Sequence, residues 1–282
     1  RQNFVSVKDE TSGKVIIGVE DGANNSYCDL LFYVNASKTI EEPNDRPVIT
    51  PDDGNEPEKP DVTETKTGTL AFEDIWPGGG DYDMNDVIVE YNRAVSFDKK
   101  NQVTKIVDTF TPVHDGAVFA NAFAYQVDKG QFGKMTFSAT TEGIHTESAT
   151  SSIIVCPNVK QTIQKVYTIT REFTGGSFNK KDLKSYNPYI IVKYAEGQKG
   201  RTEVHLPKHE ATSLADLSLA GTQKDAYYID KEGAYPFAID IPILNFISVT
   251  EKKSIDTEYP NFKAWADSKG EKYTDWYNNH VN

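Results

Sequence analysis

The sequence predicts a mostly β protein, an antiparallel β-sandwich of jelly-roll type with one or two short helices. The first reason is that its apolar residues fall in short segments rich in β-branched and aromatic side chains, several of which alternate with polar residues. The second reason is that clusters of Gly, Asn, Asp and Pro, such as GDYDMND and DKGQFG, separate these segments. Many short strands joined by such turns are typical of sandwiches and jelly rolls rather than of alternating strands and helices.

Helical patterns are few. One short helix is expected after Thr212, which can cap its first turn, with Gly221 at its end. Another is expected after Pro260, where aromatic residues share one helical face before Gly270. The expected strands cover residues 15–20, 30–34, 87–91, 103–110, 118–127, 134–138, 163–170 and 189–194.

Composition excludes several classes of protein. The chain has 282 residues, with 42 Asp and Glu against 30 Lys and Arg, and a net charge of -12. This charge repels phosphate backbones and no basic stripe offsets it, so we expect no nucleic-acid partner. No window reaches the ~18 consecutive apolar residues of a membrane span, so any anchor would lie outside this sequence. The sequence begins with Arg1 rather than Met, which fits either removal of a signal segment or a start inside a longer chain.

The amino-acid composition divides the chain into residues 1–35, 36–66 and 67–282. Residues 41–61 carry eight carboxylates and five prolines and almost no strong apolar residues, so we expect residues 36–66 to form an acidic linker or long loop. An arm of about 35 residues is too short for a core of its own, so we expect its strands to dock on the main β-sandwich domain.

The most informative stretch is LAFEDIWPGGGDYDMNDVIVEYN, which runs from Leu70 to Asn92. Asp, Asn and Gly are common turn residues, and acidic loops are often simply solvated. However, no Lys or Arg separates the carboxylates of this loop, so they would repel one another unless a cation neutralised them. Oxygen donors at this spacing suit Ca²⁺, although the loop lacks the Gly and Glu positions of a helix-loop-helix calcium site. The predicted ligands are Glu73, Asp74, Asp81, Asp83, Asn85 and Asp86.

A shorter copy of this plan occupies residues 15–35. Glu20 and Asp21 match Glu73 and Asp74, and Asp29 matches Asp86, but nothing corresponds to Asp81 and Asp83. A second metal site at Glu20, Asp21 and Asp29 is therefore the weaker prediction. The copy also contains Cys28, which either pairs with Cys156 in a disulfide or remains a separate buried thiol.

The stretch FEDIWPGGGDYDMNDVIVEY resembles the signature of the LruC-domain proteins, a bacterial cell-envelope family found especially in Bacteroides-like organisms. The segments EVHLPKHEAT, AYPFAIDIP and EYPNFKAWADSKGEKYTDWYNN are similar to later parts of that family. The resemblance implies an exported or surface-anchored β-rich protein with calcium in the acidic loop, and it implies no known activity. The N-terminal copy departs from the family pattern because its loop has no counterparts of Asp81 and Asp83.

An enzyme is not expected. No HExxH or GxSxG string occurs, and Pro207 separates His205 from His209, which breaks a helical pairing of the two. We therefore expect a non-catalytic calcium-binding module of an exported cell-surface protein, serving adhesion or surface assembly with a surface protein or glycan as partner. The alternative is a carbohydrate-binding module, for which Trp76 and Tyr82 in the acidic turn are the candidate glycan contacts.

Overall fold

The chain forms two compact units, Arg1–Glu58 and Lys59–Asn282. The structure, a computed structural model, describes residues 4–8, 15–19, 30–34, 62–173, 178–184, 186–197, 200–222 and 225–281.

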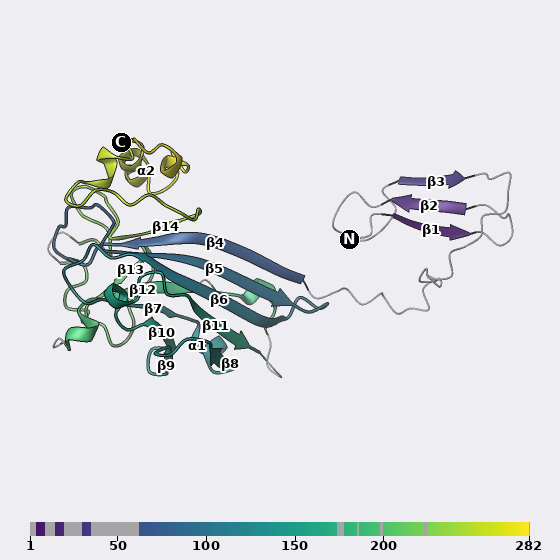
Figure 1. Cartoon of the computed structure of the whole chain (residues 1–282), viewed down its shortest axis with the longest axis horizontal. Helices are drawn as coiled ribbons and strands as arrows, with labels where there is room; N and C mark the ends of the chain where they lie inside the picture. The colour runs from purple at the N-terminus through teal and green to yellow at the C-terminus, as the bar shows by residue number, and fades with distance from the viewer. Residues whose placement is uncertain are drawn as a thin grey trace. The chain divides into compact units, whose positions relative to one another are not determined.

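The first unit contains three strands that pair with one another. β1 (Phe4–Lys8), β2 (Val15–Val19) and β3 (Leu30–Val34) form an antiparallel sheet in the order β1-β2-β3 (Figure 1). The described strands of this arm hydrogen-bond with one another in a sheet of their own. That the arm docks on the main domain stays a prediction.

The second unit contains two antiparallel sheets in a sandwich-like arrangement, which confirms the predicted fold class. One has six strands in the order β14-β4-β5-β6-β11-β8, and the other has five in the order β13-β12-β7-β10-β9. The first comprises β4 (Val62–Phe72), β5 (Val87–Phe97), β6 (Val103–His114), β8 (Thr136–Ala139), β11 (Tyr167–Glu172) and β14 (Ala238–Ile241). The second comprises β7 (Ala122–Gln126), β9 (His145–Glu147), β10 (Ser152–Cys156), β12 (Asn187–Ile191) and β13 (Glu203–His205).

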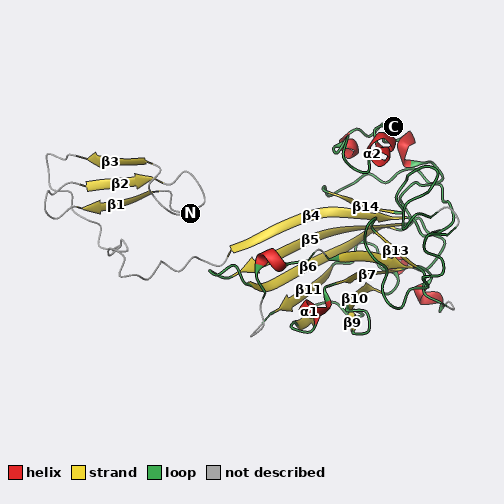
Figure 2. Cartoon of the chain, turned by 180° about the vertical axis from the view of Figure 1, so that it is seen from behind, coloured by secondary structure: helices red, strands yellow, loops and turns green. Residues whose placement is uncertain are grey.

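Helices are short and lie outside the sheets (Figure 2). In the described part of the chain, the α-helices are α1 (Lys129–Phe132) and α2 (Phe262–Asp267). The 3-10 turns are η1 (Val159–Gln161), η2 (Lys180–Asp182), η3 (Tyr194–Glu196), η4 (Ile255–Thr257) and η5 (Trp276–Asn278).

The main hydrophobic core lies between the two sheets. Phe110 of β6 contacts Phe123 and Tyr125 of β7, with ring centroids 5.1 and 5.3 Å apart. Burial alternates along most of β5 and β6, as expected for strands that pack one face against a second sheet.

The end of β4 is buried on both of its faces. Leu70 and Phe72 belong to the core between the sheets, whereas Ala71 belongs to a second cluster with Phe262 and Trp276. These last two residues come from the C-terminal segment, which we define as residues 242–281. This segment therefore covers the outer face of the six-stranded sheet where β4 ends.

Two local expectations differ from the structure. β4 already begins at Val62, inside the predicted 36–66 linker, because residues 62–66 pair along their whole length with β5. The helix expected after Thr212 is absent, and the described residues 212–222 form turns. The physical reason is that Asp216 N donates to Arg201 O at 2.8 Å rather than to the Thr212 carbonyl four residues earlier, as a helix would require. The second expected helix is confirmed as α2.

Candidate metal site

The acidic loop joins β4 to β5 at one end of the sandwich. Phe72 pairs with Val87, so the residues that follow β4 lie beside those that precede β5. Asp74 N donates to Asp86 Oδ2 at 2.7 Å, which closes the base of the loop. Met84 N donates to Glu73 Oε1 at 2.6 Å, which folds the loop back over its own start.

Three of the predicted ligands come together. Carboxylate oxygens of Glu73, Asp81 and Asp83 all lie within 4.8 Å of one another. Glu73 is fully buried, Asp83 is 2% exposed, and Asp81 faces solvent. The group therefore has a closed inner side and an open outer side, which an ion could enter.

Glu73 Oε2 is the notable atom of this group. It is buried and has no hydrogen-bond partner among the described residues. Gly80 leaves room beside it, since a Cβ at that position would collide with Glu73 Oε2. Burying a carboxylate oxygen without a hydrogen-bond donor costs free energy of folding. Binding a proton or a cation at Glu73 Oε2 would remove this cost.

Burial and mutual repulsion disfavour the charged forms of these carboxylates. Burial raises the pKa of Glu73 well above its ordinary value, and the Asp86 carboxylate raises it further. Burial also raises the pKa of Asp83 to about 6 and that of Asp86, which lies close to Asp74, to about 8. In the described part of the chain, no Lys or Arg side chain forms an ion pair with Glu73, Asp81 or Asp83.

The other predicted ligands have different roles. Burial raises the pKa of Asp74, whose Oδ2 accepts a hydrogen bond from Asn121 Nδ2 at 2.6 Å. Asn85 Nδ2 donates to Val249 O at 3.1 Å, while Asn85 Oδ1 is buried without a hydrogen-bond partner among the described residues. The loop sequence alone could not separate these residues from the three that converge.

The C-terminal segment holds the loop from outside, and the sequence did not reveal this contact. Lys252 N donates to Asp83 Oδ2 at 2.9 Å, and Ile255 N donates to Tyr82 O at 2.8 Å. The donors are backbone groups, so no side-chain pattern marks them. The resemblance of both loop and tail to one family was the only available signal that the two segments belong together.

A further buried carboxylate was also missed. Asp115 has a 2% exposed side chain, and its Oδ1 lies 3.3 Å from Lys160 Nζ. Burial raises the pKa of Asp115, and the lysine lowers it. Lys160 thus supplies a counter-charge to Asp115, which distinguishes this carboxylate from Glu73, Asp81 and Asp83.

The proposed second metal site, Glu20, Asp21 and Asp29, lies outside the described residues, as does Cys28. Cys156 is a buried free thiol whose Sγ lies 2.8 Å from Thr162 Oγ1.

The candidate glycan contacts take part in aromatic packing. Trp76 is 5% exposed, and its ring centroid lies 4.9 Å from that of Tyr228. Tyr82 is half-buried and packs edge-on against Tyr235 at 5.4 Å. The alternative of glycan binding therefore gains no support from Trp76, since its ring has almost no free face.

His205 and His209 lie in different surroundings. His205 is fully buried in β13 and stacks on Tyr189 at 4.5 Å, whereas His209 lies in the following turn.

None of the helices in the described part of the chain is long and apolar enough to cross a membrane.

Comparison with known proteins identifies a family and a fold. The structure resembles the crystal structure named "Putative lipoprotein from Bacteroides ovatus", with a TM-score of 0.58 and 16% sequence identity, covering 99% of this chain and 91% of that one. At this identity the likeness concerns the fold alone. No curated protein matches the chain.

The model of the family described as "Domain of unknown function (DUF4842)" matches residues 101–277, a range that begins after the acidic loop and includes most of the C-terminal segment. The resemblance to LruC-domain proteins stays a prediction. Because the match spans more than half of its length, the chain belongs to the DUF4842 family.

Proposed function

We propose that this chain is a non-catalytic, calcium-binding β-sandwich module of an exported bacterial cell-surface protein, serving adhesion or surface assembly. The name of the structural neighbour, a lipoprotein assignment in Bacteroides ovatus, supports a place in the cell envelope. The resemblance of the acidic loop to LruC-domain proteins supports the same location.

The calcium assignment rests on the buried carboxylate oxygen of Glu73 that has no hydrogen-bond partner. Its Oε2 is buried without a partner, in a space that it shares with oxygens of Asp81 and Asp83. Ca²⁺ binds six to eight oxygens at about 2.3–2.6 Å, and carboxylates, carbonyls and waters all serve as ligands. A Ca²⁺ ion here would offset two of the three negative charges that no described cation pairs with, and water would complete its shell on the open side at Asp81.

The role of the ion would be structural. Asp83 and Tyr82 also accept the hydrogen bonds that hold the C-terminal segment, so an ion that fixes the loop would fix this segment as well. A rigid loop end is what a surface module needs for a lasting contact with a partner, because flexible loops lose entropy on binding.

The test is calorimetric titration of calcium into Asp81→Asn. Asp81 is exposed and makes no hydrogen bond with the described residues, so this change removes a ligand charge without disturbing the packing. Glu142→Gln, at another exposed carboxylate, is the matched control. Wild type and Glu142→Gln should bind calcium, and Asp81→Asn should bind it at least about tenfold more weakly, which is about 1.4 kcal/mol.

Two results would contradict the assignment. Absence of calcium binding by the wild type at millimolar concentration would exclude the site altogether. Loss of binding in Asp29→Ala but not in Asp81→Asn would place the ion in the N-terminal copy instead.

A further inference from the structure

The first half of β4 is an open edge of the six-stranded sheet. β4 pairs with β5 along its whole length, whereas β14 pairs only with residues 69–72 of β4 (Figure 1). β14 ends at Ile241, because the next residue, Pro242, has no N–H group with which to continue the ladder. Among the described residues, no strand therefore lies beside residues 62–67 on this side of β4.

The backbone groups that face this edge belong to alternate residues. Glu73, which continues β4, donates its N–H to Phe237 O at 2.9 Å on the side of β14. Because backbone groups alternate between the two sides of a strand, those of Thr63, Thr65 and Thr67 point to the same side as those of Glu73. No hydrogen bond within the described ranges occupies these outward groups. A row of unpaired backbone groups can bind an added strand.

The sequence of this edge is complementary to itself when two copies run antiparallel. Residues 63–67 read TETKT, so a pairing centred on Thr65 places Glu64 opposite the partner's Lys66 on the same face of the sheet. The same centre places Thr63 opposite the partner's Thr67, which aligns the outward backbone groups of both copies. A shift of one residue would lose both the charge pairing and the hydrogen bonds.

The charged side chains of this edge remain accessible to a partner. Within one chain, Lys66 Nζ lies 2.9 Å from Asp240 Oδ2, and Glu64 pairs with Lys180. The exposed fractions of these four side chains lie between 29% and 58%. Exposed ion pairs contribute little free energy, and both Glu64 and Lys66 can form additional contacts.

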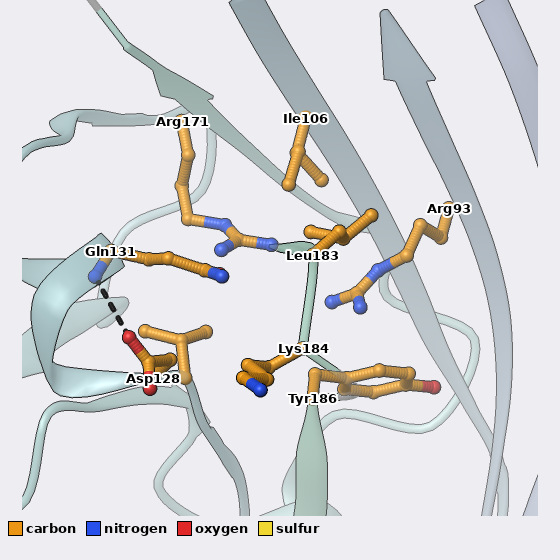
Figure 3. A pocket seen from close by; sticks show the side chains of 9 residues that line it. Arg93, Ile106, Asp128, Gln131, Arg171, Leu183, Lys184 and Tyr186 are labelled. Carbon is orange, nitrogen blue, oxygen red and sulfur yellow. Dashed lines mark hydrogen bonds between the residues drawn. The ribbon is translucent and has the colours of Figure 1, made fainter. Parts of the chain in front are cut away.

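The strands behind this edge are held by a buried cluster. Arg93 of β5 lies opposite Lys66, and its Nε lies 2.6 Å from Asp108 Oδ1. Arg171 Nη2 of β11 lies 2.9 Å from Asp108 Oδ2. Figure 3 shows the two guanidinium groups extending toward one another, and the Tyr186 ring centroid lies 3.7 Å from the Arg93 guanidinium carbon. A sheet fixed in this way loses little conformational entropy when a further strand binds.

We propose that two copies of this chain associate through the open edge of β4, with residues 63–67 of each copy paired antiparallel about a two-fold axis at Thr65. The pairing joins the two six-stranded sheets into one continuous sheet. Since β4 leads from this edge to the acidic loop, the two acidic loops lie at opposite ends of the joined sheet, each roughly 25 Å from the axis. The interface uses no residue of the acidic loop and does not depend on calcium.

The first test is sedimentation equilibrium of the full chain from about 1 μM to about 1 mM, because a short strand pairing forms a small interface. A reversible equilibrium between monomer and dimer is expected. Thr65→Pro removes the central N–H donor, which faces the open edge, so the fold tolerates it and dimerisation weakens at least about tenfold. Thr65→Val keeps this donor and is the matched control, with unchanged dimerisation.

Exchange of charges tests the register. Glu64→Lys alone and Lys66→Glu alone each place like charges opposite one another, so each variant should stay monomeric. An equimolar mixture of the two variants should form a heterodimer, because opposite charges then face one another again. This rescue shows that both variants are folded and that these two positions meet across the interface.

Three results would overturn the proposal. A wild type that stays monomeric up to about 1 mM would exclude the dimer. Slow hydrogen exchange of the Thr65 amide in that monomer would mean that another segment of the same chain occupies the edge. A dimer that persists in Thr65→Pro and in both charge variants would place the interface elsewhere on the molecule.

Discussion

Glu73 is the residue on which the candidate metal site depends most. Its two oxygens differ, since Oε1 accepts from Met84 N at 2.6 Å and Oε2 has no hydrogen-bond partner among the described residues. Burial raises its pKa, so without a cation this group favours the protonated form. A cation at Oε2 would reverse that preference, because the charged form would then gain a partner of opposite charge.

Gly80→Ala should lower calcium affinity at least about tenfold. The added Cβ would collide with Glu73 Oε2 and push this oxygen away from Asp81 and Asp83. Gly133→Ala is the control, since its Cβ would meet Lys129 O at 3.7 Å, an ordinary contact. Titration calorimetry measures both, and unchanged affinity in Gly80→Ala would mean that Glu73 Oε2 does not bind the ion.

At the scale of elements, the C-terminal segment depends on the acidic loop. Its aromatic cluster packs on β4 and β14, but its backbone bonds to the site go to Asp83 and Tyr82. If repulsion among Glu73, Asp81 and Asp83 moves the loop when no cation is bound, those hydrogen bonds break first.

Removal of calcium should therefore loosen the C-terminal segment. It contains Trp265 and Trp276, and the third tryptophan, Trp76, lies in the loop itself, so all three report on this region. At pH 8, a chelator should shift tryptophan emission to longer wavelength and speed proteolysis within residues 242–281. Asp81→Asn should behave in this way even with calcium, and Glu142→Gln should not. Identical emission and cleavage with and without chelator would mean that the C-terminal segment does not depend on the metal site.

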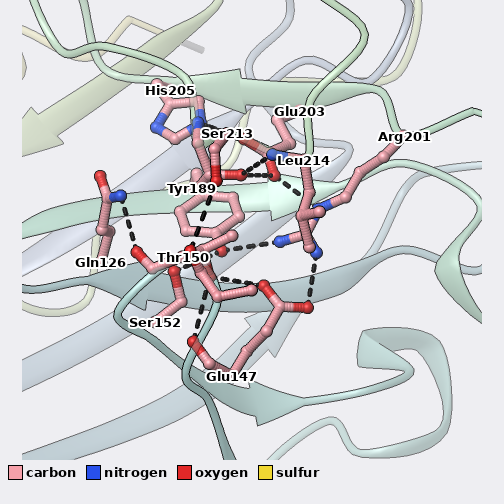
Figure 4. Close-up of polar contacts among 12 residues, drawn as sticks. Gln126, Glu147, Thr150, Ser152, Tyr189, Arg201, Glu203, His205, Ser213 and Leu214 are labelled. Atoms are coloured by element: carbon pink, nitrogen blue, oxygen red, sulfur yellow. Dashed lines mark hydrogen bonds and ion pairs between the residues drawn. The ribbon is translucent and has the colours of Figure 1, made fainter.

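The short strand β13 is fixed by a buried polar network (Figure 4). Glu203 accepts hydrogen bonds from His205 Nε2 at 2.9 Å and from Thr212 Oγ1 at 2.7 Å, and it pairs with Arg201 at 2.5 Å. Burial by itself would raise the pKa of Glu203, but these partners hold it below its ordinary value. The network thus ties β13 to the turn that begins at Thr212.

Glu203→Gln should destabilise the fold by about 3 kcal/mol at pH 7, since it leaves the largely buried Arg201 guanidinium without this carboxylate. A carboxyl group whose pKa is lowered on folding stabilises above its unfolded value and loses that effect as pH falls. The difference from wild type should therefore shrink below the ordinary value of 4.5. Urea unfolding at pH 7 and pH 4 measures this, with the exposed Glu172→Gln as control. A difference that does not vary with pH would assign the effect to packing alone.

At the scale of the whole molecule, the proposed calcium ion would compete with protons for the carboxylates of the acidic loop. Burial places the pKa of Asp83 at about 6 and that of Asp86 at about 8, both above the ordinary value of 3.8. From the ordinary value of 3.8 up to these raised values, the cation-free native state binds more protons than the unfolded state. Its stability therefore falls as pH rises through this range. A bound cation removes this loss, because it stabilises the ionised carboxylates.

Thermal melts with calcium and with chelator should therefore diverge between pH 4 and pH 8 and converge in acid. With calcium at 100 times its dissociation constant, the gain at neutral pH is about 2.7 kcal/mol. Differential scanning calorimetry at pH 4, 6 and 8 measures the gap. Melts that coincide at pH 8 would count against a cation in the acidic loop.

The sequence by itself determined the features that arise from neighbouring residues. Period-2 alternation and Gly, Asn and Asp turns predicted the antiparallel sandwich, because strand faces and turn conformations are local properties. Residues 81–86 were identified as a candidate cation loop for the same reason, since closely spaced carboxylates repel wherever the loop is placed.

Only the tertiary structure decided which side chains meet across the fold. Lys252 lies 169 residues from Asp83, and Arg171 lies 63 residues from Asp108, so no local pattern joins either pair. Tertiary contact also overrode local preference after Thr212, because Asp216 N donates to Arg201 O at 2.8 Å rather than to the Thr212 carbonyl of a first helical turn. The folded loop likewise decides which of its acids converge, since only there do oxygens of Glu73, Asp81 and Asp83 lie within 4.8 Å of one another.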